Sequence, residues 1–387
     1  MYKRRLMVPG PVEVDWEVLN QMSNPQIAHY NDEAIQIYND CVQSLKKLLR
    51  CDRKANVYII PGSGSVALDS CIGSVVRKED KILVAINGNF GERLKVQAES
   101  FGAEVVEVRV EPGKAIRGEM IKNTIEKNHS IKAILAVHLE TTTGVLNPIW
   151  EIGTVAKKYD IPLIVDCVSS FGTEEFNMEE WGVSLCGAAV QKGLETPPGL
   201  GIIAVSQRGW KAVESGRSPG CGWYLNLLTW RDYSRTNIVR KGVVYPLMVT
   251  MPVNNVRALK LSLNNILDEG LENRIERHCR ISRIVREGLL QVGFDEFPEK
   301  EFSSHVVTAM RNTFGVNISE MINFIKDMYN TEISNGLFGL NNKIFRIGHI
   351  GQSASLEYVV PVLFGIEHFL RTKGFSIPKG ASLAGIE

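Results

Sequence analysis

Short apolar runs alternate with helical patterns along residues 17–250, and this alternation limits the possible folds more than any other feature of the chain. Four runs have the length and composition of buried strands: 56–60, 81–86, 131–138 and 162–166. Residues 152–159, between the last two, have apolar spacing that predicts a helix. Strands joined by helical crossovers build a largely parallel sheet that is covered on both faces. The sequence therefore predicts an α/β fold that binds its ligands at the carboxyl ends of the strands.

The pattern changes after about residue 250. Residues 253–292 form a long helical stretch with a break expected near Gly270. Short strands are expected at 304–309 and 343–347, and helices at 319–329 and 356–372. This mixture predicts a smaller α+β domain at the C-terminal end. The expected division is an N-terminal arm at 1–16, a large domain at 17–265 and a small domain at 266–387.

Composition excludes several classes of protein. Lysine and arginine number 44 against 43 acidic residues, so the net charge of +1 argues against a basic nucleic-acid-binding protein. No run of 18 apolar residues predicts a membrane span, and no long apolar stretch follows the basic N-terminus as it would in a secretory signal. The seven cysteines form no CxxC pair, which favours reduced thiols over disulfides or a zinc site. We expect a cytoplasmic protein without a metal.

The first feature with chemical meaning is Gly62-Ser63-Gly64-Ser65, between a predicted strand and a predicted helix. Glycines let the backbone approach an anion, and the helix N-terminus offers free N–H groups. The segment is not a Walker motif, because no Gly-Lys-Ser or Gly-Lys-Thr follows. An ordinary tight turn between a strand and a helix would have the same pattern.

Two ionisable residues follow apolar segments. Asp166 ends the run 162–165, where a partly desolvated carboxylate needs a cationic partner. Lys192 follows the apolar segment 188–190, and a lysine in a desolvated pocket becomes a nucleophilic amine. A capping aspartate and a solvated surface lysine are the alternatives. An anion cradle, a carboxylate and a lysine together fit pyridoxal phosphate, through its phosphate, its pyridinium nitrogen and its aldehyde.

Further motifs along nearly the whole chain make the sequence resemble the class V aminotransferases of fold type I, in the alanine–glyoxylate and serine–pyruvate branch. The motifs that carry the resemblance are Val8-Pro9-Gly10-Pro11, Gly62-Ser63-Gly64-Ser65, Gly88-Asn89-Phe90-Gly91, His138-Leu139-Glu140-Thr141-Thr142-Thr143-Gly144, Val165-Asp166, Gln191-Lys192 and Phe345-Arg346-Ile347-Gly348. Together they are highly specific for the family and less specific for the substrate.

The resemblance implies a role for each matching residue. Lys192 would form the Schiff base with the cofactor, Asp166 would pair with the pyridinium nitrogen, and Arg346 would bind the substrate α-carboxylate. The other implied contacts are phosphate binding by Ser63, Gly64, Ser65 and Gln191, ring stacking by Phe90, a polar contact near the phenolic oxygen from Thr141, and an apolar contact from Val168. Many relatives have His at the position of Ser65.

The resemblance also implies a homodimer with shared active sites. Thr250 matches a phosphate ligand that comes from the second subunit. The aromatic residue that some relatives carry three positions earlier is Leu247 here, so that contact is absent or comes from Tyr245.

The implied function is transfer of an amino group from a small amino acid, of the alanine or serine type, to glyoxylate or pyruvate. Transaminases for 2-aminoethylphosphonate or pyridoxamine with pyruvate are close alternatives, and a phosphonate donor would need extra cations such as Arg217, Arg231, Arg235 or Arg240. A cysteine desulfurase is less favoured, because Gln191 replaces the histidine that typically precedes the lysine and Cys221 lies outside the expected region. A non-catalytic scaffold is disfavoured by the presence of Lys192, Asp166 and Arg346.

Overall fold

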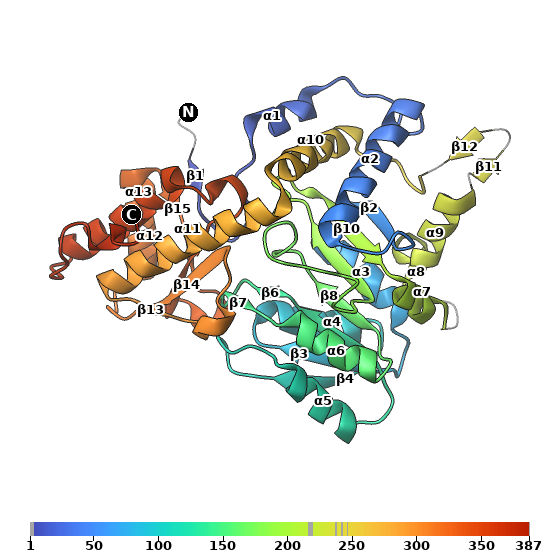
Figure 1. Ribbon diagram of the computed structural model, residues 1–387, viewed down its shortest axis with the longest axis horizontal. Coiled ribbons are helices and arrows are strands. Elements are labelled where there is room, and N and C mark those ends of the chain that lie inside the picture. Colours follow the sequence, from blue (N-terminus) through green and yellow to red (C-terminus); the bar gives the residue numbers. More distant parts are fainter. Residues whose placement is uncertain (1–3, 216–219, 237, 241–242, 246, 387) are drawn as a thin grey trace.

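A seven-stranded sheet forms the centre of the molecule (Figure 1). The computed structural model describes residues 4–386 apart from 216–219, 237, 241–242 and 246. The strands lie in the order β2 (Asn56–Gly62), β10 (Gly199–Val205), β9 (Leu185–Ala189), β8 (Leu163–Asp166), β5 (Ile131–Val137), β3 (Lys81–Ile86) and β4 (Glu104–Arg109). The two pairings of β10, with β2 and with β9, are antiparallel, and the other four pairings in this sheet are parallel. The prediction of a largely parallel sheet is confirmed.

Both faces of this sheet are covered, as the alternation of its side chains requires. In β5, Ile134 and Ala136 belong to the core on one face, whereas Ala133, Leu135 and Val137 belong to the core on the other. The first core is covered by α2 (Asp32–Leu49), α5 (Gly118–Lys127), α6 (Ile149–Lys158) and α10 (Val253–Glu269). The second is covered by α3 (Gly64–Val75), α4 (Asn89–Ser100), α7 (Gln207–Glu214) and α9 (Leu227–Thr236). We call the sheet with these helices the large-sheet region.

A four-stranded antiparallel sheet lies towards the C-terminal end and has a core of its own. Its strands are ordered β13 (Asp295–Glu296), β14 (Val307–Arg311), β17 (Ile344–Gly348) and β16 (Ser334–Asn335). Three helices pack with it: α11 (Leu271–Val292), α12 (Ile318–Tyr329) and α13 (Leu356–Thr372). We call this part the small-sheet region. This combination of helices with an antiparallel sheet confirms the expected α+β arrangement.

The long helical stretch breaks where the sequence predicts. Gly270 separates α10 from α11 and has φ +82°, a backbone conformation that favours glycine. The expected boundary between residues 265 and 266 falls inside α10, so the division into domains at that position stays a prediction.

One predicted strand begins later than expected, because a serine side chain turns the chain before it. Residues 304–309 were predicted to be extended, but β14 begins at Val307. Ser304 Oγ accepts hydrogen bonds from the backbone N–H groups of Val306 and Val307, at 3.0 and 3.1 Å. Such local bonds compete with a strand ladder.

The N-terminal arm connects the two regions. Its strand β1 (Arg5–Leu6) pairs in parallel with β15 (Thr331–Glu332). Met7 accepts a 2.7 Å hydrogen bond from the N–H of Gly348, at the end of β17. Further along, the N–H of Val12 donates to the carbonyl of Gln191 at 3.1 Å. The arm therefore reaches from the small-sheet region to the segment that carries Lys192.

Shorter elements complete the described chain. These are α1 (Trp16–Asn20), the pair β6 (Leu139–Glu140) and β7 (Val145–Leu146), α8 (Gly222–Leu225), and the pair β11 (Ile238–Arg240) and β12 (Val243–Tyr245). Among the described residues, no helix combines the length and apolar character needed to cross a bilayer.

Candidate active site

A cavity of about 200 Å³ lies at the carboxyl edge of the large sheet, where β8 and β9 end side by side. Most of the residues predicted for the site line it, although they come from separate segments. The lining consists of Ser63, Gly64, Ser65, Leu68, Phe90, Arg93, Leu139, Asp166, Val168, Ser169, Gln191 and Lys192. The parallel strands thus bring Asp166 and Lys192 together as the sequence predicts.

The start of α3 presents unused hydrogen-bond donors to this cavity. Ser63 is the N-cap residue, but its side chain makes no capping hydrogen bond. The first bond of the helix comes from the N–H of Ala67 to the carbonyl of Ser63. Within the described part of the chain, no acceptor is found for the N–H groups of Gly64 and Ser65. These groups and the positive end of the helix dipole suit a phosphate.

Asp166 is almost completely buried, with 5% of its surface exposed. Burial raises the pKa of its carboxyl group to about 6, and the negative charge of Glu140 acts in the same direction. The N–H of Val168 donates to Asp166 Oδ1 at 2.8 Å and partly opposes this shift. Such a carboxylate gains from a cationic partner, which a pyridinium nitrogen would provide.

Lys192 is partly buried, and its Nζ donates a hydrogen bond to the carbonyl of Pro9 in the N-terminal arm. Desolvation, together with the charge of Arg346, lowers the pKa of its amine to about 8, whereas Asp166 opposes the shift. The arm lies very close to this amine: a Cβ atom at Gly10 would be 2.3 Å from Lys192 Nζ. An amine with this pKa is neutral in part of the molecules at neutral pH, as a nucleophile must be.

Arg346 reaches the same part of the molecule from β17 of the small sheet. Its guanidinium donates to the carbonyl of Thr141 at 3.0 Å and to that of Asn335 at 2.9 and 3.1 Å. Burial lowers the pKa of Arg346 to about 10, so the group stays charged at neutral pH. An arginine side chain has five N–H donors. These three bonds use one donor on each nitrogen, which leaves one N–H on each terminal nitrogen for a ligand. That pair matches the two oxygens of a carboxylate.

Thr141 is buried but does not line the cavity, and the structure shows its carbonyl rather than its hydroxyl in a contact with Arg346. Thr250 is exposed and does not line this cavity, and Leu247 is half-buried against the core of the large-sheet region. The side chain of Tyr245 lies outside the described residues, as does Arg217. The contacts predicted for Thr141, Thr250 and Tyr245 therefore stay predictions.

Two charged residues of the site were missed in the sequence. Glu140 is fully buried and accepts hydrogen bonds from the N–H groups of Phe90, Gly91 and Thr142, at 2.9, 3.2 and 3.0 Å. Arg93 lines the cavity, and its guanidinium carbon lies 4.8 Å from the centre of the Phe90 ring. The spacing from Phe90 to Arg93 is one helical turn, and this could have indicated a shared face.

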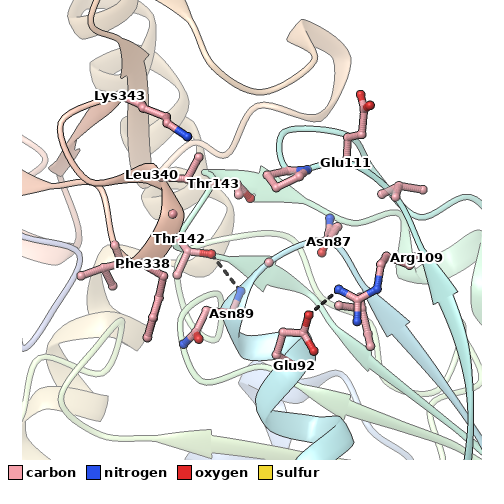
Figure 2. Close-up of a pocket in the computed structure, with 16 residues that line it drawn as sticks. Asn87, Asn89, Glu92, Arg109, Glu111, Thr142, Thr143, Phe338, Leu340 and Lys343 are labelled. Atoms are coloured by element: carbon pink, nitrogen blue, oxygen red, sulfur yellow. Dashed lines mark hydrogen bonds and ion pairs between the residues drawn. The ribbon is translucent and has the colours of Figure 1, made fainter.

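A larger cavity of about 710 Å³ lies beside the site, between the large sheet and the small-sheet region (Figure 2). One wall contains Asn89 and Thr142, which directly adjoin Phe90 and Thr141 in the chain. Thr142 Oγ1 accepts a 3.2 Å hydrogen bond from the N–H of Asn89, and Glu92 pairs with Arg109. The opposite wall is the segment Leu337–Leu340, in which Phe338 is mostly exposed. This cavity lies where the two regions meet, with residues of both on its walls.

The largely parallel sheet, with a lysine and a carboxylate at its carboxyl edge, is the architecture of the fold type I enzymes that depend on pyridoxal phosphate. The profile of the family described as "Aminotransferase class-V" matches residues 16–229. The chain belongs to this family and is an aminotransferase.

Individual relatives agree with this assignment. The chain is 36% identical to an uncharacterized aminotransferase of Methanocaldococcus jannaschii, over 97% of this chain and 94% of the relative. It is 31% identical to L-aspartate–glyoxylate aminotransferase of Paracoccus denitrificans, over 89% and 86% of the two chains. The crystal structure of ureidoglycine–glyoxylate aminotransferase from Bacillus subtilis superposes with a TM-score of 0.91 at 29% identity and covers 100% of this chain and 97% of that one. Other relatives are named serine–glyoxylate and alanine–glyoxylate aminotransferases.

The family implies pyridoxal phosphate, and the residues present fit that group. Gln191 lines the cavity, and its Oε1 is buried without a hydrogen-bond partner among the described residues, so this oxygen is left to accept from a ligand, whereas a phosphate would take the amide N–H groups. Gly64 is held against Val168, because a Cβ atom at Gly64 would lie 2.6 Å from Val168 Cγ2. The cavity is therefore lined for a flat, anionic group, with donors at one end and Asp166 and Lys192 on its walls.

Proposed function

We propose that this aminotransferase moves an amino group from a small amino acid, of the alanine or serine type, to glyoxylate or pyruvate. The observation that carries the proposal is Arg346, which is buried, charged and electrostatically coupled to Lys192. Amino acid and oxo acid share one feature, an α-carboxylate. A single arginine at this place would serve both half-reactions. The relatives named for glyoxylate support the choice of acceptor.

Particular residues would hold the cofactor. Ser63, Gly64, Ser65 and Gln191 would bind its phosphate, Phe90 and Val168 would enclose its ring, and Asp166 would face its nitrogen. Bound pyridoxal phosphate supplies an electron sink for the bonds of the substrate α-carbon. Lys192 would hold the aldehyde end and carry a proton to and from the α-carbon. Arg346 would keep the α-hydrogen directed at Lys192.

The proposal is tested by replacing Arg346. Arg346→Ala should weaken the binding of the amino acid and the oxo acid together, because both lose the same contact. The expected loss is about 2–5 kcal/mol, as for truncating a buried charge pair. Cofactor binding, measured by absorbance titration, should change little, since the phosphate cradle and Asp166 belong to the large-sheet region. Arg311→Ala, an exposed arginine on the adjacent strand β14, is the control. Normal binding of both substrates by Arg346→Ala would show that the carboxylate is held elsewhere.

A donor with a phosphonate in place of the carboxylate is the alternative that one observation favours. Arg93 lines the cavity and is exposed, and the described salt bridges do not include it. Arg231, by contrast, is paired with Glu214 and lies over Trp210. The side chains of Arg235 and Arg240 lie outside the described residues. An aminoethylphosphonate donor could use Arg93.

A matrix of donors and acceptors separates these possibilities. Alanine, serine, aspartate, aminoethylphosphonate and pyridoxamine should each be tested with glyoxylate and with pyruvate. Aminoethylphosphonate and pyridoxamine have no α-carboxylate, so with them Arg346→Ala should impair mainly the oxo-acid half-reaction. Arg93→Ala should impair aminoethylphosphonate selectively if the phosphonate binds there.

We further propose a cytoplasmic homodimer with shared active sites. Two residues that line the cavity, Ser63 and Arg93, are exposed in the single chain, and a neighbouring subunit could cover them. Thr250 is exposed and available to such a neighbour.

The desulfurase alternative gains no support from the geometry. Cys221 lies at the start of α8 and packs near Gly73 of α3, where a Cβ atom would be 2.6 Å from the cysteine Cβ. It does not line the cavity that contains Lys192.

A further inference from the structure

Two arginines and two glutamates form a largely buried cluster where the large-sheet and small-sheet regions meet. We call Glu195, Glu269, Arg274 and Arg277 the interregion cluster. Glu195 lies three residues after Lys192, Glu269 ends α10, and both arginines lie near the start of α11, which leads into the small-sheet region (Figure 1). The Arg274 side chain is only 3% exposed. The charges of the cluster balance, which allows these groups to be buried.

The cluster holds the backbone that follows Lys192. Arg274 Nε donates to the carbonyl of Gly172 at 2.8 Å, and Arg274 Nη2 donates to the carbonyl of Gly193 at 2.9 Å. Arg274 also pairs with the carboxylate of Glu195. The N–H of Glu195 donates to the carbonyl of Lys192 at 2.9 Å, which closes a tight turn, and Glu195 has φ +45°. A strained residue of this kind persists only where its surroundings hold it.

The same cluster holds the backbone that follows Arg346 and its strand β17. The second carboxylate oxygen of Glu195 accepts a hydrogen bond from the N–H of Gln352. Arg277 Nη1 donates to the carbonyls of Gly351 and Ala354, at 2.8 and 3.1 Å. A single carboxylate, that of Glu195, therefore joins Arg274 on one side to the segment after β17 on the other.

Covalent connection alone would not fix this arrangement. Between α10 and α11 the chain passes through Gly270, whose conformation interrupts the helix. Glu269 and its partners Arg274 and Arg277 bridge that break, with Arg274 Nη1 3.0 Å from Glu269 Oε2 and Arg277 Nε 2.6 Å from Glu269 Oε1. The cluster thus fixes the angle at which the two regions meet.

From these contacts we infer that Glu195 and Arg274 are positioning residues, which fix the distance between Lys192 and Arg346 and thereby control how the substrate carboxylate is held. The inference rests on the proposed function only for the roles of Lys192 and Arg346. A buried ion pair by itself is weak ground for stability, because its desolvation offsets much of the attraction. The consequence expected here is geometric: a displacement of about 1 Å can lower a rate by about 100-fold.

The test replaces Glu195 by glutamine, which keeps an acceptor for Gln352 but removes the charge opposite Arg274. In the holoenzyme, Glu195→Gln should lower kcat/KM for the oxo acid between about 10- and 100-fold, by the same positional argument, while cofactor affinity stays within about twofold. Arg274→Lys, which keeps the charge but loses the multiple donors, should act in the same direction. Glu151→Gln is the matched control, since Glu151 pairs with Arg117 inside the large-sheet region.

A second measurement does not depend on activity. Spin labels at Val96 on α4 and Met328 on α12, both exposed, report the distance between the two regions by pulsed electron paramagnetic resonance. In the holoenzyme before substrate is added, Glu195→Gln should broaden or shift this distance distribution, and Glu151→Gln should not. The partly buried cysteines Cys51, Cys221 and Cys279 would be replaced by serine in all labelled forms.

The outcomes are distinguishable. An unchanged distance together with an unchanged kcat/KM in Glu195→Gln would overturn the inference, and so would a loss of cofactor affinity equal to the loss of kcat/KM, which is what a merely structural role produces. If Arg346→Ala leaves the oxo-acid KM unchanged, the proposed carboxylate site fails. The distance measurement would then still decide whether the cluster sets the angle between the regions.

Discussion

Burial moves the pKa values of Asp166 and Lys192 towards each other. The carboxyl pKa rises to about 6 and the amine pKa falls to about 8, in both cases chiefly because solvent is excluded. Between these pH values Asp166 is negative and Lys192 is positive, but each charged form is less stable in the folded protein than it would be in water. Such destabilised groups are typical of sites that become stable only when a ligand binds.

Replacing Asp166 by asparagine should stabilise the protein without cofactor. The carboxyl pKa is about 6 when folded against 3.8 unfolded, so the folded state binds more protons between these values and loses stability as pH rises through that window. Above pH 6, Asp166→Asn should therefore raise the free energy of unfolding by about 3 kcal/mol, at 1.36 kcal/mol for each pKa unit. Asparagine can still accept from the N–H of Val168.

Urea unfolding of the cofactor-free protein at several pH values measures this effect. The advantage of Asp166→Asn should shrink as pH falls from 6 and vanish below about 4, where both states carry the proton. Cofactor affinity should fall in the same variant. Asp295→Asn, at an exposed aspartate of β13, should change stability by less than about 0.5 kcal/mol. A variant that is less stable than the parent at pH 8 would contradict the argument.

The reactivity of Lys192 should increase around a pH of about 8. Only the neutral amine attacks an electrophile. Its fraction rises as pH passes the pKa of about 8, whereas an ordinary lysine has a pKa of 10.5. Competitive labelling of the cofactor-free protein with acetic anhydride, read by peptide mass spectrometry, gives this midpoint directly. Asp166→Asn should move it to lower pH, because the Asp166 charge favours the protonated amine. A midpoint near 10.5 would show that the lysine is not desolvated.

At the scale of elements, the N-terminal arm is the part that joins functional segments. It bonds to Gly348 through Met7, to Lys192 through Pro9 and to Gln191 through Val12. The arm has little regular structure of its own, with β1 covering Arg5–Leu6. Its backbone rather than its side chains makes these contacts.

A side chain at position 10 should displace the amine of Lys192. Its φ of +129° disfavours other residues, and a Cβ atom would lie 2.3 Å from Lys192 Nζ. Gly10→Ala should therefore lower cofactor affinity, measured by absorbance titration, by at least tenfold, or about 1.4 kcal/mol. Gly380→Ala is the control, because Gly380 also has positive φ, +79°, but no atom lies within 4 Å of its Cβ position. Equal effects of the two substitutions would mean that backbone strain alone matters.

Features that depend on neighbouring residues in the chain could be predicted from the sequence. Asp166 and Lys192 end or follow apolar strands, and parallel strands bring such ends together, so their proximity could be predicted. The starts of α3 and α13 and the break at Gly270 likewise carry local signals. Local patterns also set the bounds of the strands that were predicted within a few residues, whereas β4 (Glu104–Arg109) was not predicted.

The rest depends on contacts between segments far apart in the chain. Nothing near Glu140 indicates that its carboxylate accepts from Phe90 and Gly91, and nothing near Pro9 indicates that its carbonyl faces Lys192. Arg346 could be singled out only by family resemblance, because a strand arginine is usually solvated. The interregion cluster was missed for the same reason: Glu195 lies far along the chain from the other members, which fall within residues 269–277.

At the scale of the whole molecule, the single chain leaves the cavity open at Ser63 and Arg93. A symmetric dimer would close both sites with the same pair of surfaces. Thr250 is the residue expected to cross from one subunit to the other.

Sedimentation velocity should show a dimer, and mixing variants should show whether its sites are shared. Lys192→Ala should be inactive and Thr250→Ala should bind cofactor weakly. A hybrid of the two has both defects in one site and neither in the other, so mixed subunits should regain activity at limiting cofactor. Each parent protein after the same mixing treatment is the control. An active monomer, or no recovery on mixing, would refute shared sites.

The arm also dictates when in the life of the chain the site can form. Synthesis proceeds from the N-terminus, so the arm leaves the ribosome long before β15 and β17, with which β1 and Met7 bond. Until those strands exist, Pro9 has no fixed position and the lysine amine stays uncovered. We therefore expect cofactor capture to be a late event in biogenesis, after release of nearly the entire polypeptide. A nascent or truncated chain would fold much of its large sheet and still not bind the cofactor well.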